Sequence, residues 1–123
     1  MEKEKKILVV DDDQAILEIL EEVLSYYGYH VSTLANADKV FERISEYHPD
    51  LILLDVMLGP MDGRMICRAI KSIANVAGIP IIMISATEST SSMLSLDFAP
   101  NDFLQKPFDV NYLIEKIEHQ LAA

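Results

Sequence analysis

The feature that most constrains this fold is the alternation of short apolar runs with segments whose apolar residues recur at helical spacing. Three runs contain no polar residue, namely Ile7–Val10, Leu51–Leu54 and Ile81–Ile84. Such runs are typical of strands buried on both faces of a parallel sheet. Strict alternation of strands and helices also implies right-handed crossovers, which place helices on both faces.

Two weaker strands and five helices complete the pattern. His30–Leu34 is a more polar strand, expected near an edge, and 103–104 is a short last strand. Helical spacing occurs over residues 16–24, 40–44, 65–73, 93–96 and 110–121. We predict an α/β fold: a (βα)5, doubly wound five-stranded parallel sheet with flavodoxin-like strand order 2-1-3-4-5, forming one domain over residues 1–123.

Helix ends are marked by residues with known end preferences. Asp13 and Asp109 are expected to cap the first and last helices, because Asp accepts hydrogen bonds from unpaired N–H groups of a first turn. Gly28 is expected to end the first helix, and the second must end before Pro49.

Composition limits the function. Lys and Arg number 10 against 20 Asp and Glu, a net charge of −10, which excludes capture of bare nucleic acid and disfavours anionic membranes. The single cysteine, Cys67, excludes an internal disulfide and thiolate metal clusters. No stretch is long enough to span a membrane and no signal peptide is evident, so we expect a cytoplasmic protein.

Acidic residues follow two of the apolar runs. Asp11 and Asp12 follow the first strand and Asp55 follows the third, and these strands are neighbours in the predicted order. A lone Asp here is usually a turn or cap residue, but three carboxylates at adjacent strand ends require raised pKa values or a cation. Mg²⁺ suits such oxygen ligands, and Mn²⁺ is expected to substitute for it.

Two further polar residues lie on the same edge. Ser85 ends the fourth strand and Lys106 ends the fifth; taken alone, they read as a turn residue and a surface lysine. Pro107 is either a simple strand stop or a cis-proline. Beside a carboxylate cluster, a hydroxyl and an ammonium suit a transferring phosphoryl group, and a carboxylate nucleophile would give an acyl phosphate.

The chain resembles the receiver domain of two-component response regulators along essentially its whole length. The segments that carry the resemblance are VVDDD at 9–13, DLILLDVMLGPMDG at 50–63, MISA at 83–86 and FLQKPF at 103–108. The resemblance implies that Asp55 is the phospho-acceptor. It also implies a Mg²⁺ site of Asp12, Asp55 and the Met57 backbone carbonyl, with Asp11 binding mainly through water.

By the same resemblance, Ser85 would hydrogen-bond the phosphoryl group, Lys106 would pair with it, and Ser85 and Phe103 would form a switch. The Ser-rich helix expected around 93–96 is either a solvated face or a soft surface that changes with phosphorylation. The phosphoryl donor would be a histidine kinase or a histidine phosphotransfer protein that docks near the first helix. One narrow buried face of that helix cannot include all of its apolar residues, so some of them are expected to be available for contact with the donor. These residues are Ile16, Ile19, Leu20 and Val23. The resemblance also implies an output protein or output domain as a further partner and a phosphorylation-dependent dimer. We expect the domain to act in signalling rather than as an enzyme.

The chain departs from the usual family pattern at four places. A proline usually stands four residues after the phospho-acceptor, whereas here Gly59 precedes Pro60, so the loop that carries the Met57 carbonyl is expected to follow an altered path. Phe98-Ala99 replaces Gly-Ala. Ser85 and Phe103 stand where Thr and Tyr are commoner, so Phe103 has no hydroxyl to offer a partner.

Three alternatives remain from the sequence. Asp11-Asp12-Asp13 matches the D-x-D signature of haloacid dehalogenase enzymes, but Ala15 replaces the usual Thr or Val and the chain is short. A flavodoxin-like electron carrier would need a hydroxyl- and glycine-rich loop where this chain has DDDQ. A receiver-shaped module that only binds partners would not need Asp12, Asp55, Ser85 and Lys106.

Overall fold

Five parallel strands form the centre of the molecule in a computed structural model that describes residues 4–86 and 99–122. The strands are β1 (Lys6–Val10), β2 (His30–Leu34), β3 (Leu51–Asp55), β6 (Ile81–Ser85) and β7 (Asp102–Gln105). Their spatial order is β2-β1-β3-β6-β7, which confirms the predicted order 2-1-3-4-5 and the edge position of the polar strand.

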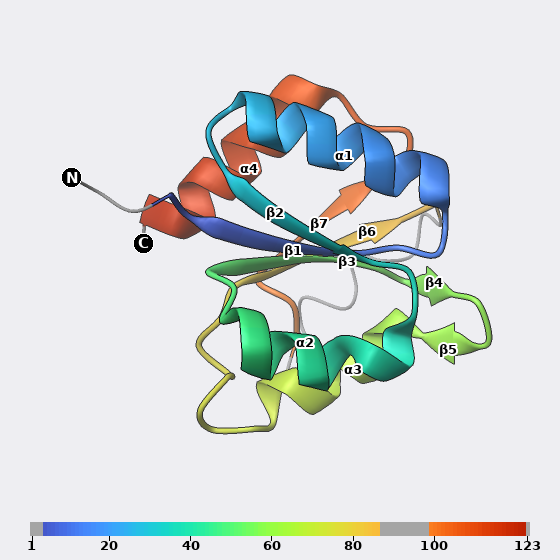
Figure 1. Ribbon diagram of the computed structural model, residues 1–123. Helices are drawn as coiled ribbons and strands as arrows, with labels where there is room; N and C mark the ends of the chain where they lie inside the picture. Colours follow the sequence, from blue (N-terminus) through green and yellow to red (C-terminus); the bar gives the residue numbers. More distant parts are fainter. Residues whose placement is uncertain (1–3, 87–98, 123) are drawn as a thin grey trace.

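Helices cover both faces of the sheet (Figure 1). The helices α1 (Gln14–Tyr26) and α4 (Val110–Ala122) lie on one face, while η1 (Ala37–Lys39), α2 (Val40–Tyr47) and α3 (Gly63–Lys71) lie on the other. The helix expected around 93–96 falls within 87–98, outside the described residues.

Successive side chains of each central strand enter opposite cores. Leu8 and Val10 pack into the core beneath α2 and α3, whereas Ile7 and Val9 pack beneath α1 and α4. Every residue of β3 and β6 is buried, as expected for strands covered on both faces. Cys67 of α3 is also buried, and this burial raises the pKa of its thiol to about 11.

The predicted helix ends are confirmed. The Asp13 side chain accepts a hydrogen bond from the Ala15 N–H at 3.0 Å, and Asp109 accepts one from the Asn111 N–H at 2.7 Å. Gly28 follows α1 at φ +91°, in the region that favours glycine.

A two-stranded hairpin at the carboxyl end of the sheet was missed by the sequence analysis. Its strands are β4 (Met57–Leu58) and β5 (Met61–Asp62), joined through Gly59 and Pro60. Gly59 has φ +62°, which fits the first position of a two-residue hairpin turn. Helix α3 also begins two residues earlier than expected, because the Asp62 side chain caps it by accepting from the Arg64 N–H at 2.9 Å.

Candidate functional site

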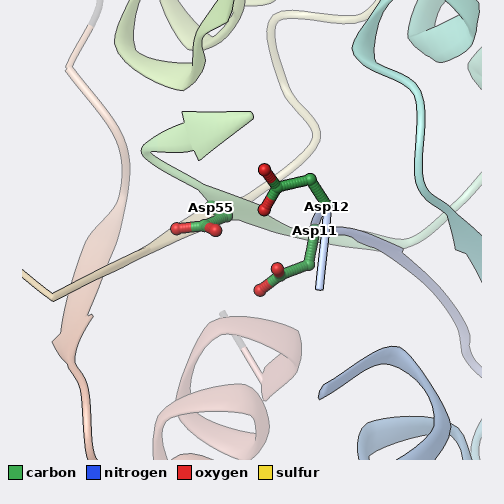
Figure 2. A group of neighbouring side chains, drawn as sticks. All are labelled: Asp11, Asp12 and Asp55. Atoms are coloured by element: carbon green, nitrogen blue, oxygen red, sulfur yellow. The ribbon is translucent and has the colours of Figure 1, made fainter. Parts of the chain in front are cut away.

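Three carboxyl groups meet at the carboxyl ends of β1 and β3, as predicted. One oxygen from each of Asp11, Asp12 and Asp55 lies within 4.8 Å of the others (Figure 2). Asp11 and Asp55 are buried, whereas Asp12 is exposed. The neighbouring positions of β1 and β3 bring together residues that are more than 40 positions apart in the sequence.

Lys106 is the cation of this cluster. Its Nζ lies 3.1 Å from Asp11 Oδ2 and 3.3 Å from Asp55 Oδ2. Burial lowers the pKa of Lys106, but the hydrogen bonds and charges of the two carboxylates outweigh this and raise it, so the ammonium stays protonated. Its backbone N–H donates to the Ser85 carbonyl at 2.7 Å, and the Lys106–Pro107 peptide bond is cis, the second of the two readings of Pro107.

The cluster carries excess negative charge, because among the described residues one ammonium faces three carboxylates. Burial, and then the charge of Asp11, raise the pKa of Asp55 to about 6, although Lys106 and the Met57 N–H act to lower it. The Asp55 side chain is only 7 % exposed, so water screens this repulsion weakly. A cation at the cluster would therefore favour the ionised form of Asp55.

Backbone groups hold the carboxylates in place. The Asp13 N–H donates to Asp11 Oδ1 at 2.9 Å, and the Gly59 N–H at the hairpin tip donates to Asp12 Oδ2 at 2.9 Å. Sequence reasoning missed the role of Gly59, since its partner lies 47 residues away.

Gly63 is a second backbone element that sequence reasoning missed. A Cβ at this position would collide with the Asp55 carbonyl oxygen and approach the Asp55 carbonyl carbon to 2.9 Å. The Gly63 N–H donates to the Val56 carbonyl at 2.7 Å, so the first residue of α3 packs directly on the backbone of the candidate phospho-acceptor. The D-G pair at 62–63 was the sequence signal for this close approach.

The remaining predicted site residues lie around the cluster. Ser85 is fully buried at the end of β6, one position beyond Ile84, the partner of Asp55. Met57 is 62 % exposed on β4. Phe103 is half-buried beside Met83, two positions before the end of β6, and packs against the core beneath α2 and α3.

A largely apolar groove lies next to Lys106. It has a volume of about 460 Å³ and runs between α1 and the segment that follows β7; its lining includes Ile16, Ile19, Ala86, Pro107 and Phe108. Ile19 is 55 % exposed, whereas Leu20 is buried. One part of the apolar surface of α1 is therefore accessible, as the sequence analysis expected.

This fold, with carboxylates and a lysine at the strand ends, defines a receiver-type α/β domain. The sequence model of the response regulator receiver domain matches residues 7–118, and the chain belongs to this family. The sensory transduction protein BceR of Halalkalibacterium halodurans is 35 % identical over 114 residues, which cover 92 % of this chain and 48 % of BceR. The DNA-binding response regulator MtrA of Mycolicibacterium paratuberculosis is 33 % identical over 118 residues, which cover 95 % of this chain and 51 % of MtrA.

Solved structures agree with this assignment. The crystal structure of a putative response regulator from Chloroflexus aurantiacus superposes with a TM-score of 0.89 at 31 % identity, covering 98 % of this chain and 100 % of that one.

The chain spans about half the length of the curated relatives it matches. Among the described residues, no helix has the length and apolar character needed to cross a membrane.

Proposed function

We propose that this chain accepts a phosphoryl group on Asp55 from a phosphohistidine of a histidine kinase or a histidine phosphotransfer protein. The observation that carries the proposal is the position of Asp55, buried within a carboxylate cluster and 3.3 Å from the ammonium of Lys106. A buried carboxylate that is destabilised as an anion and paired with one fixed cation is suited to a reaction that brings in a cation and a phosphoryl group.

In the proposed step, an Asp55 carboxylate oxygen attacks phosphorus and forms an acyl phosphate. The P–N bond of the donor breaks, and its electron pair stays on the imidazole nitrogen of the donor. The Lys106 ammonium pairs with a phosphoryl oxygen and the Ser85 hydroxyl donates to another. These two groups stabilise the charge that is spread over the outer oxygens in the transition state.

The metal site would consist of Asp12, Asp55 and the Met57 backbone carbonyl, with Asp11 binding mainly through water. These are hard oxygen donors, which suit Mg²⁺ and also Mn²⁺. The cation would neutralise the cluster so that the phosphoryl group can approach Asp55.

Phosphorylation would act as a switch through Ser85 and Phe103. The phosphoryl group adds negative charge, which attracts the Ser85 hydroxyl and the Lys106 ammonium. Movement of Ser85 at the end of β6 would alter the start of segment 87–98 and the packing of Phe103. NMR spectra with and without beryllofluoride test this: unchanged signals around Ser85 and Phe103 would contradict the switch.

The phosphohistidine partner would dock over the groove between α1 and Lys106. The groove offers apolar contacts beside Asp55, and the exposed Glu18, Glu21 and Glu22 of α1 favour a partner with basic residues at the rim. An output protein or output domain, and a phosphorylation-dependent second copy, are further proposed partners of the switched state. In this role residues 1–123 act as one signalling domain rather than as an enzyme with its own substrate.

Intact-mass analysis after incubation with acetyl phosphate tests the phospho-acceptor. We expect one added phosphoryl group in the presence of Mg²⁺, and none without Mg²⁺ or in Asp55→Asn. Asp38→Asn, an exposed position outside the carboxylate cluster, serves as the matched control and should be phosphorylated like the wild type. No added mass in the wild type, together with no beryllofluoride binding, would favour a module that only binds partners.

The docking surface is tested by Ile19→Lys. This change should slow phosphoryl transfer from histidine kinases about 10-fold while leaving acetyl phosphate as effective as before, because the small donor needs no docking surface. Tyr112→Lys, at an exposed position on α4, is the control. Equal transfer rates for Ile19→Lys and the wild type would place the docking surface elsewhere.

A further inference from the structure

The tip of the β4–β5 hairpin contacts the exposed carboxylate of the cluster. The Gly59 N–H donates to Asp12 Oδ2 at 2.9 Å, which joins the hairpin to the turn between β1 and α1. Asp12 is the member of the cluster that solvent reaches, so its side chain is the least restrained by packing. This hydrogen bond, rather than packing, therefore restrains the orientation of the Asp12 carboxylate.

The order of the two residues at the hairpin tip decides whether the hydrogen bond exists. Leu58 pairs with Met61, so Gly59 and Pro60 form a two-residue connection, and Gly59 has φ +62°. Proline has no N–H and a φ fixed near −65°. A proline at position 59 could neither adopt the observed conformation nor donate to Asp12, whereas the proline at position 60 leaves the Gly59 N–H available.

We propose that the Gly59 N–H positions Asp12 for the cation, so that the hairpin tip and the cation share one carboxylate. This inference rests on the proposed function and specifies its metal site. An ionised carboxylate has two oxygens with about four lone-pair directions, so one oxygen can accept from Gly59 while the other binds the cation. Hydrogen bonds that orient metal ligands in this way typically change metal affinity about 10- to 100-fold.

The same arrangement couples the cation to the hairpin. Met57, whose carbonyl is a proposed ligand, begins β4, and Gly59 directly follows the end of β4. A cation held by Met57 and Asp12 would therefore restrain β4 at both ends. By linkage, a change at the hairpin tip alters metal affinity even though no proposed metal ligand is replaced.

The inference is tested by exchanging the two residues of the hairpin tip in the full chain, with Gly59→Pro and Pro60→Gly combined; we call this the reversed variant. We expect Mn²⁺, followed by electron paramagnetic resonance, and Mg²⁺, followed by calorimetry, to bind about 10-fold more weakly to this variant. Pro60→Ala is the matched control, because it changes the same turn but keeps Gly59 and its N–H. Its Mn²⁺ affinity should remain within about twofold of that of the wild type.

Amide hydrogen exchange supplies a readout that a general loss of stability would not reproduce. The Gly59 N–H should exchange slowly in the wild type, stay protected when Mg²⁺ is added, and lose its protection in Asp12→Ala. If the reversed variant does not fold, these measurements still show whether the hydrogen bond persists beside the bound cation, which the proposal requires.

Equal metal affinity of the wild type and the reversed variant would overturn the inference. Tighter binding by the reversed variant, or loss of Gly59 protection when Mg²⁺ is added, would also overturn it, by showing that the hydrogen bond competes with the cation. In each of these cases the proposed phosphorylation of Asp55 would stand. Failure of the wild type to bind Mn²⁺ at all would instead overturn the proposed metal site, and this inference with it.

Discussion

Both ends of the parallel sheet carry charged side chains. Those at the amino end are paired through hydrogen bonds, whereas those at the carboxyl end carry excess negative charge. At the amino end, Asp50 Oδ2 accepts from the Lys6 N–H at 2.8 Å, and Lys6 Nζ donates to the Tyr47 carbonyl at 2.9 Å. Nearby, Lys71 Nζ donates to the carbonyls of Ala77 and Ile79 and to Asn101 Oδ1 at 2.6–3.1 Å. Each of these charged groups has a hydrogen-bond partner, whereas the carboxyl end holds, among the described residues, three carboxylates against one ammonium.

The difference shows how one sheet separates stability from function. The hydrogen bonds at the amino end stabilise the connections between helices and strands. Breaking one of these bonds would leave a partly buried polar group without its partner. Unmatched charge at the carboxyl end destabilises the fold until a cation or a proton arrives. Removing a hydrogen-bonded group at the amino end should therefore lower the free energy of unfolding, whereas neutralising a carboxylate of the cluster at the carboxyl end should raise it.

The largest effect is expected at Gly63, where the carboxyl end depends on backbone packing. Gly63→Ala places a Cβ against the backbone of Asp55 and should lower the free energy of unfolding by about 3 kcal/mol in urea titrations. Gly78→Ala is the control: a Cβ there meets nothing within 4 Å, so its effect should stay within about 0.5 kcal/mol. Equal effects at the two glycines would contradict the close approach at Gly63.

A smaller loss is expected at the amino end. Asn101 Oδ1 accepts from both Lys71 Nζ at 2.6 Å and the Ile81 N–H at 2.9 Å. Asn101→Ala removes both bonds and should lower the free energy of unfolding by about 2 kcal/mol without changing Mn²⁺ affinity. Asn111→Ala, at an exposed position on α4, should change stability by less than about 0.5 kcal/mol. If Asn101→Ala were as stable as the wild type, the hydrogen bonds at the amino end would contribute little to stability.

A gain in stability is expected from neutralising Asp55. Its pKa of about 6 in the fold lies above the ordinary value of 3.8, so ionised Asp55 costs stability at pH 7, and the cost disappears as pH falls below about 4. Without Mg²⁺, Asp55→Asn should raise the free energy of unfolding at pH 7 by about 1 kcal/mol, and the gain should shrink between pH 6 and 4. Urea titrations at a series of pH values measure this gain. If Asp55→Asn were less stable than the wild type at pH 7, the idea that excess charge destabilises the carboxyl end would be wrong.

The smallest effect is expected at Tyr47. Its hydroxyl donates to the His30 carbonyl at 3.0 Å and lies 2.6 Å from His30 Nδ1, but these bonds are exposed to solvent. Tyr47→Phe should therefore lower the free energy of unfolding by only about 0.5 kcal/mol, measured by thermal and urea unfolding. A loss as large as that of Asn101→Ala would mean that the partly buried bond from the Ile81 N–H to Asn101 does not account for the larger effect expected there.

The architecture and the carboxylate cluster were predictable because long-range order here follows from local patterns. Apolar runs identify buried strands, and parallel pairing then brings Asp11 and Asp55 to the same edge. The position of Lys106 beside the carboxylates also followed from the strand ends, and the structure shows it there. The switch roles of Ser85 and Phe103 came from the family resemblance, and the functional roles of all three residues stay predictions.

The β4–β5 hairpin was not predictable in the same way, because strands of two residues carry no periodicity. Its contact with Asp12 depends on the positive φ of Gly59 and on a separation of 47 residues, and neither is encoded in a local pattern. The start of α3 was misplaced for a simpler reason: the cap at Asp62 precedes the first apolar residue of the helical pattern.

The burial of Cys67 has a practical consequence for labelling. With a thiol pKa of about 11 and 1 % exposure, Cys67 should react very slowly with maleimides and iodoacetamides at neutral pH. A cysteine introduced at an exposed position such as Tyr26, which is 85 % exposed, would then take up a probe selectively. The chain also contains no tryptophan, so a fluorophore placed there would report on partner binding without an intrinsic indole background.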